Sequence, residues 1–158
     1  MNMKKQKINE MDLTVPAYSQ NEGVARQAVC AFLAKLDPTL EELADLRTAL
    51  SEAVTNCVVH AYKEKGQGKI YINVKLYSDR SIKMCIKDKG CGMADPEKCM
   101  EPLYTTDKSG ERGGMGFAIM QCFTDTLQLK TAPGKGTSVT LCKKLADDAQ
   151  RREDLGGV

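Results

Sequence analysis

Hydrophobic and polar residues alternate in five stretches of the chain, which is the pattern of strands with one buried face. The alternation is cleanest at residues 69–77 and 81–88, KIYINVKLY and SIKMCIKD, which a short Ser-Asp-Arg turn joins. A Pro-Gly-Lys turn joins residues 125–133 to 136–145 in the same way. With residues 8–17 as a fifth strand, the two hairpins predict a largely antiparallel sheet.

Three other stretches carry apolar residues at every third or fourth position, the spacing of an amphipathic helix. They span about residues 21–36, 40–62 and 114–123. The positions that we expect to be buried in the first two are Val24, Ala28, Phe32 and Leu36, then Leu43, Leu46, Leu50, Ala53 and Cys57. Capping-box patterns precede both helices, formed by Ser19 with Glu22 and by Thr39 with Glu42.

The order of these elements predicts an α/β fold. An antiparallel sheet whose amphipathic helices cover one face makes a two-layer α/β sandwich. Residues 1–145 are expected to form this single domain. The charged residues 146–158 have no apolar stripe and are expected to form a loose, disordered tail. Residues 89–113 lack periodicity, and so long a connection in a compact domain usually has a function, often as a mobile lid.

Composition argues against several classes of protein. A net charge of +2 over 158 residues lacks the basic surplus of a protein that binds nucleic acid directly. No apolar run approaches the roughly 20 residues that cross a membrane. The N-terminus does not resemble a secretory signal. Seven cysteines without CxxC spacing favour a reduced, cytoplasmic protein with neither disulfides nor a zinc site.

Glu52 and Asn56 lie four residues apart in the second predicted helix and therefore share one face. Poor helix formers surround them, so helix propensity alone does not explain this sequence. One interpretation is a solvated polar stripe. The other is that the Asn56 carbonyl oxygen binds a hard cation while Glu52 acts as a base. His60 follows on the same face but is the only histidine, so a structural hydrogen bond is favoured over a metal site.

Asp88 ends a predicted strand, and Gly90 and Gly92 follow it. This pattern is compatible with an ordinary turn. It is also compatible with a carboxylate that accepts a hydrogen bond from a ligand amino group, beside glycines that let the backbone approach the ligand.

Residues 102–120 combine hydroxyl and basic side chains with glycines at the start of a predicted helix. Free amides at a helix N-terminus attract phosphate, and Lys108 and Arg112 could add charge-assisted bonds. A flexible glycine linker would explain the glycines alone. Neither GxxxxGK[ST] nor GxGxxG occurs where those motifs require it, so nucleotide binding would need a different fold.

These motifs, in this order, resemble those of the ATPase superfamily of gyrase B, the Hsp90 chaperone, histidine kinases and MutL. That superfamily has an α/β sandwich, the Bergerat fold, with a lid over ATP. FLAKLDPTLEEL, SEAVTNCVVHAY, PLYTT and ERGGMGFAIM closely resemble the anti-sigma F factors of endospore-forming bacteria, over about residues 8–145. The resemblance implies a homodimer that inhibits a sporulation sigma factor and phosphorylates its anti-anti-sigma antagonist on serine with ATP. A binding module without kinase turnover and a detached histidine-kinase ATP domain are the alternatives.

The same resemblance implies a role for each matching residue. Asn56 would ligate Mg²⁺, Glu52 would be the general base, and Asp88 would accept from the adenine amino group. Arg112 would meet the γ-phosphate, and Arg26 would lie on the partner-binding surface. The other residues implied to contact ATP or ADP are Gly90, Gly92, Met93, Thr105, Thr106, Lys108, Gly114, Met115, Gly116, Phe117 and Thr137. The chain departs from the family pattern with Asp107 in the place of a lysine, and with Gly113 in that of a serine.

Overall fold

A computed structural model of the chain describes residues 4–63, 68–101 and 115–156. Within these ranges five strands form one antiparallel sheet in the order β1-β2-β3-β5-β4. The strands are β1 (Lys7–Pro16), β2 (Lys69–Tyr77), β3 (Ser81–Asp88), β4 (Thr126–Thr131) and β5 (Thr137–Lys144). All five predicted strands and both predicted hairpins are therefore confirmed.

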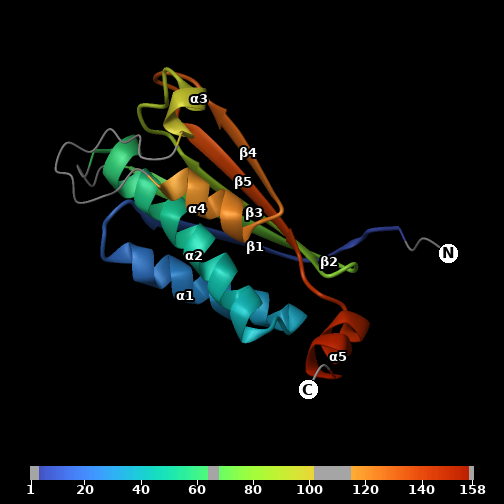
Figure 1. Cartoon of the computed structure of the whole chain (residues 1–158). Coiled ribbons are helices and arrows are strands. Elements are labelled where there is room, and N and C mark those ends of the chain that lie inside the picture. The colour runs from blue at the N-terminus through green and yellow to red at the C-terminus, as the bar shows by residue number, and fades with distance from the viewer. Residues whose placement is uncertain (1–3, 64–67, 102–114, 157–158) are drawn as a thin grey trace.

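Helices cover one face of this sheet (Figure 1). The three that form the layer are α1 (Asn21–Leu33), α2 (Leu40–Asn56) and α4 (Gly116–Phe123), and α2 contacts both of the others. A 3-10 turn, η1 (Ala34–Leu36), follows α1, a π-turn, η2 (Cys57–Ala61), follows α2, and a short helix, α3 (Pro96–Cys99), precedes α4. The predicted two-layer α/β sandwich is confirmed.

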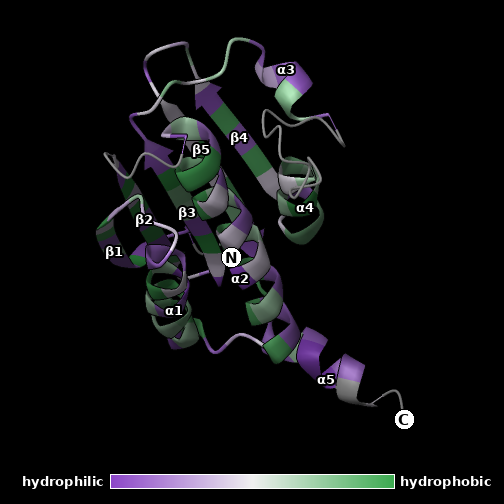
Figure 2. Ribbon diagram, turned by 90° about the vertical axis from the view of Figure 1, so that its left-hand side faces the viewer, coloured by the Kyte–Doolittle hydropathy of each residue, from purple (hydrophilic) through white to green (hydrophobic). Residues whose placement is uncertain are grey.

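The hydrophobic core fills the space between the sheet and the helices. In β2 every second residue is buried, namely Ile70, Ile72, Val74 and Leu76. The same alternation is visible as bands of colour on β4 in Figure 2. None of the helices in the described ranges combines the length and the apolar character that crossing a membrane requires.

The helix α1 begins at Asn21 as predicted, but its predicted buried face and N-terminal cap are partly wrong. Val24 is 54% exposed, whereas Ala25 and Val29 are fully buried. The prediction followed a strict spacing of four residues, which drifts by about 40° at each step around a helix with 3.6 residues per turn. The Ser19 capping box is also absent, because the N-cap is Gln20, one residue after Ser19, and it makes no side-chain cap bond.

The predicted start and buried face of α2 are confirmed, whereas the helix ends at Asn56 rather than near residue 62. Glu42 N–H donates to Thr39 Oγ1 at 3.1 Å, and Thr39 N–H donates to Glu42 Oε2 at 2.8 Å, which completes the capping box. Four residues of the predicted stripe are buried and the fifth packs against the core: Leu46, Leu50, Ala53 and Cys57, with Leu43. The capping box fixes the first residue of α2, and it therefore also fixes where Glu52 and Asn56 lie three to four turns later in the helix.

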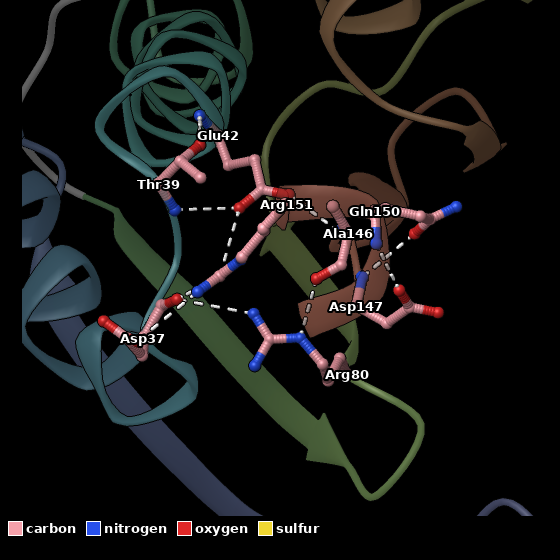
Figure 3. A network of polar contacts seen from close by, with 8 residues as sticks. All are labelled: Asp37, Thr39, Glu42, Arg80, Ala146, Asp147, Gln150 and Arg151. Carbon is pink, nitrogen blue, oxygen red and sulfur yellow. Dashed lines mark hydrogen bonds and ion pairs between the residues drawn. The ribbon is translucent and has the colours of Figure 1, made fainter. Parts of the chain in front are cut away.

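Contrary to the expected loose tail, residues Asp148–Gly156 form a helix, α5. Arg151 Nη1 lies 3.3 Å from Asp37 Oδ2, and Arg151 Nη2 lies 3.7 Å from Glu42 Oε2 (Figure 3). Ala146 N–H donates to Glu42 Oε1 at 2.7 Å, and Arg80 Nε donates to the Ala146 carbonyl at 2.9 Å. The prediction failed because it looked for an apolar stripe, whereas polar contacts hold this helix against the start of α2.

This network predicts different effects for two adjacent arginines. Arg151→Ala removes the ion-pair partner of Asp37 and of Glu42, which closes the capping box of α2, and should lower the free energy of unfolding by about 1–2 kcal/mol. Arg152→Ala changes an exposed neighbour and should lower it by less than about 0.5 kcal/mol. Urea denaturation of both variants measures the difference. Equal losses would show that the network does not stabilise the fold.

Candidate functional site

Glu52 and Asn56 lie on α2 and converge on the first residue of α4, Gly116. A Cβ placed on Gly116 would lie 3.3 Å from Glu52 Oε2 and 3.5 Å from both Nδ2 and Oδ1 of Asn56. Both side chains are half-buried. The shared face predicted from their spacing is therefore present, and a carboxylate and an amide face the same end of a neighbouring helix.

That end of α4 is its N-terminus. Met115 is the N-cap residue, and it provides no side-chain hydrogen bond to cap the helix. The first amides of a helix carry partial positive charge and lack partners within the helix. Phe117 and Met120 are buried in the core and hold α4 beside α2, while Met115 remains 38% exposed. The arrangement is suited to an anionic group that meets the amides of α4 and the side chains of α2 together.

A second group of polar contacts surrounds Asp88, which ends β3 and is only 4% exposed. The N–H groups of Gly90 and Thr137 donate to Asp88 Oδ1 at 2.9 and 3.2 Å. The Cys57 thiol donates to Asp88 Oδ2 at 3.7 Å. Burial raises the pKa of Asp88, and the three donors act in the opposite direction by stabilising the carboxylate. The hydrogen bond from Gly90 is typical of an ordinary Asx-type turn. The deep burial of the Asp88 side chain is not typical of such a turn.

The glycines around Asp88 let three segments of the chain itself pack closely. A Cβ on Gly92, which has a φ of +67°, would lie 1.9 Å from the Ala132 carbonyl oxygen. A Cβ on Gly90 would lie 2.3 Å from the Ala61 carbonyl oxygen. The sequence had suggested that these glycines admit a ligand. In the structure they admit η2 and the turn between β4 and β5, and their contact with a ligand stays a prediction.

Two hydroxyl groups connect the same segments. Thr137 Oγ1 and Thr131 Oγ1 are 2.9 Å apart, and Thr131 Oγ1 accepts from Met93 N–H at 2.9 Å. Thr131 Oγ1 also lies 3.1 Å from the carbonyl oxygen of Gly136, to which it can donate. The predicted residues Met93 and Thr137 are therefore joined through Thr131, which sequence reasoning did not single out.

Tyr62 is another residue that the sequence did not indicate. Its hydroxyl donates to the Lys69 carbonyl and accepts from Lys89 N–H, both at 2.7 Å. It thereby fixes the backbone that follows Asp88. The π-turn that carries the chain from Asn56 to Tyr62 was predicted as continuing α-helix, and only its poor helix formers gave a signal. His60 lies within this turn and does not keep the α-helical spacing assumed for it.

The remaining predicted residues are not part of these two groups. Arg26 lies on α1, half-buried, and its Nη1 donates to Ser51 Oγ at 3.5 Å, beside Glu52. The others, together with the two departures from the family pattern, lie outside the described residues: Thr105, Thr106, Asp107, Lys108, Arg112, Gly113 and Gly114.

Comparison with known proteins gives a consistent result. Residues 15–143 match the histidine kinase-like ATPase domain family. An anti-sigma F factor of Bacillus subtilis is 46% identical over 138 residues, which cover 87% of this chain and 94% of the relative. That of Caldanaerobacter subterraneus is 50% identical over 135 residues, covering 85% and 93%.

Solved structures share the fold. The RsbU and RsbW domains of a Mycobacterium tuberculosis protein superpose with a TM-score of 0.65 at 20% identity, over 89% of this chain and 33% of that one. The histidine kinase domain of a blue-light activated kinase from Erythrobacter litoralis gives 0.54 at 15% identity, over 90% and 66%. At these identities the likeness concerns the arrangement of strands and helices alone.

Proposed function

The chain belongs to the anti-sigma F factor family and carries a histidine kinase-like ATPase domain, and from this premise we propose that it is both a sigma-factor inhibitor and an ATP-dependent serine kinase. It would hold a sporulation sigma factor inactive and phosphorylate the anti-anti-sigma antagonist, as a cytoplasmic homodimer. The observation that carries the proposal is the convergence of Glu52 and Asn56 on Gly116 at the start of α4. A side-chain oxygen for Mg²⁺, a carboxylate that orients the nucleophile and helix amides that face phosphate can together support phosphoryl transfer.

The residues around Asp88 fit an adenine ring. Asp88 is a buried acceptor at the end of the sheet, and the Thr137 side chain lies beside it. An exocyclic amino group can donate to this carboxylate, whereas a carbonyl in the same place would be repelled by it. We therefore assign adenine to Asp88 and Thr137, and the phosphates to the start of α4.

The residues around Asn56 fit a magnesium ion held largely by phosphate. Among the described residues no group of three or more His, Cys, Asp or Glu gathers to hold a metal. Mg²⁺ commonly takes only one or two protein ligands and completes its oxygen shell with phosphates and water. Asn56 would supply the protein oxygen, and the ion would neutralise charge on the phosphates.

Glu52 would act on the attacking hydroxyl of the partner's serine. Its carboxylate can take the proton or hold the hydroxyl in line for transfer. Arg112, Lys108, Thr105 and Thr106 would surround the phosphates, in the segment that leads to Gly114.

The direct test is a phosphorylation assay. The protein is incubated with Mg²⁺, ATP labelled at the γ-phosphate, and an anti-anti-sigma protein from the same cell. We expect the label on a serine of that protein, and a separate complex with a sigma factor. If both partners bind but no label is transferred, the chain is a nucleotide-dependent binding module and the kinase proposal is wrong.

Arg26 provides a test of the partner-binding surface. Arg26→Ala should weaken the complexes with sigma factor and antagonist by about ten-fold or more, because arginine often dominates binding at interfaces. ATP affinity should stay nearly constant, because Arg26 lies on α1 and contacts Ser51 rather than the groups proposed to hold ATP. Lys35→Ala, at an exposed residue in η1, is the matched control. An equal loss of partner and nucleotide affinity would indicate a folding defect instead.

A further inference from the structure

Asp88 has one hydrogen-bonding position left for a ligand. A carboxylate offers about four acceptor positions, two on each oxygen. In the described part of the chain, Oδ1 accepts from the N–H groups of Gly90 and Thr137, and Oδ2 accepts from the Cys57 thiol. The second position on Oδ2 is the one that remains for an amino group.

Cys57 therefore contacts the oxygen of Asp88 that keeps an acceptor position. Cys57 is 3% exposed and is the first residue of η2, directly after Asn56. Its one thiol hydrogen can be donated to the Ala53 carbonyl, at 3.4 Å, or to Asp88 Oδ2, at 3.7 Å, and the second of these bonds is the one that reaches the carboxylate. The thiol is a hydrogen-bond donor to that oxygen, so it limits how the carboxylate can turn about the bonds that fix Oδ1.

We propose that Cys57 is a positioning residue for base recognition, whose thiol orients Asp88 Oδ2 toward the amino group of an adenine nucleotide. This inference rests on the proposed binding of ATP at Asp88. It makes Cys57 a determinant of which purine is accepted, since the orientation of Oδ2 decides whether an amino group is favoured over a carbonyl. Cys57 also links base recognition to Asn56, its neighbour in the chain.

The proposal is tested by comparing ATP with ITP, which carries a carbonyl in place of the amino group. Affinities for both, with Mg²⁺, are measured by calorimetry for the full chain. Cys57→Ala should weaken ATP binding by about five-fold, the value of one modest hydrogen bond, and should change ITP binding by less than about two-fold. Cys57→Ser keeps a donor and should restore the preference for ATP. Cys57→Val fills the volume without a donor and should behave like Cys57→Ala, which covers the case of an alanine variant that does not fold.

Three results would overturn the role of Cys57. An equal loss of ATP and ITP affinity would mean that Cys57 only supports the fold. An unchanged preference in Cys57→Ala and Cys57→Val would mean that it has no role. A serine variant that behaves like alanine would mean that the donor is irrelevant. Cys122→Ala, at an exposed cysteine of α4, is the control and should leave both affinities unchanged.

Asp88→Asn separates this inference from the assignment of adenine to Asp88. An asparagine can present either a donor or an acceptor, so the preference for ATP over ITP should disappear. If it disappears in Asp88→Asn but persists in Cys57→Ala, only the proposal for Cys57 fails. If Asp88→Asn keeps the preference, adenine binds elsewhere and both proposals fail.

Discussion

Glu52→Gln should abolish transfer of phosphate to the partner's serine while ATP remains bound. A glutamine keeps the size of the side chain and one acceptor oxygen but cannot take a proton, and loss of a general base lowers rates by about 10²–10⁴-fold. The ATP contacts assigned to Asp88, Thr137 and Asn56 do not involve a proton on Glu52. Single-turnover transfer of labelled phosphate and equilibrium binding of ATP measure the two effects separately.

The control for this prediction lies on the same helix. Glu41→Gln changes an exposed carboxylate in the first turn of α2 and should leave transfer and ATP affinity near their original values. Normal turnover of Glu52→Gln would rule out Glu52 as the base. A parallel loss of ATP binding would instead place Glu52 among the groups that hold the nucleotide.

Much of the fold is predictable because the sheet and α2 are specified locally. Each strand alternates between a buried and an exposed face, and a shift by one residue would expose its whole apolar set. Thr39 and Glu42 determine where α2 begins. At the start of α1 the pattern of Ser19 and Glu22 was misleading, since Gln20 is the N-cap and makes no side-chain bond. The buried face of α1 also follows a mixture of three- and four-residue steps.

The tail and the π-turn depend on contacts between distant parts of the chain. Arg151 is held by Asp37 and Glu42, which lie more than a hundred residues earlier, and no local pattern in the tail indicates them. In the same way, η2 is stabilised where Cys91 N–H donates to the Ala61 carbonyl at 3.0 Å. Such pairings appear only once the fold brings the segments together.

In the candidate site, too, some features follow from local sequence and others depend on contacts between distant segments. The spacing of Glu52 and Asn56 is a property of one helix, so their shared face follows from the sequence. That they face Gly116 depends on how α4 packs against α2. The contact of Cys57 with Asp88 depends on η2 meeting the end of β3, and in the sequence Cys57 was only one of several apolar positions.

Gly92→Ala should strongly destabilise the fold near the site. Alanine is strained in the left-handed backbone conformation of Gly92, which has a φ of +67°. Its Cβ would also lie 1.9 Å from the Ala132 carbonyl oxygen. The oxygen belongs to the backbone, so the turn between β4 and β5 must move, and with it the Thr137 N–H that donates to Asp88. We expect a loss of about 3 kcal/mol or more in the free energy of unfolding, and weaker ATP binding in whatever remains folded.

Gly134→Ala separates the clash from the backbone strain. Gly134 has a similar φ of +73°, but a Cβ there would meet nothing within 4 Å. Its substitution should therefore lower the free energy of unfolding only through the strain of the left-handed conformation, by about 1–2 kcal/mol. ATP affinity should stay nearly unchanged. Urea denaturation and ATP titration of both variants give the comparison. Equal destabilisation of Gly92→Ala and Gly134→Ala would show that the segments around Asp88 pack more loosely than their carbonyl contacts indicate. Asp88 would then not be the rigid acceptor that the proposed recognition of adenine requires.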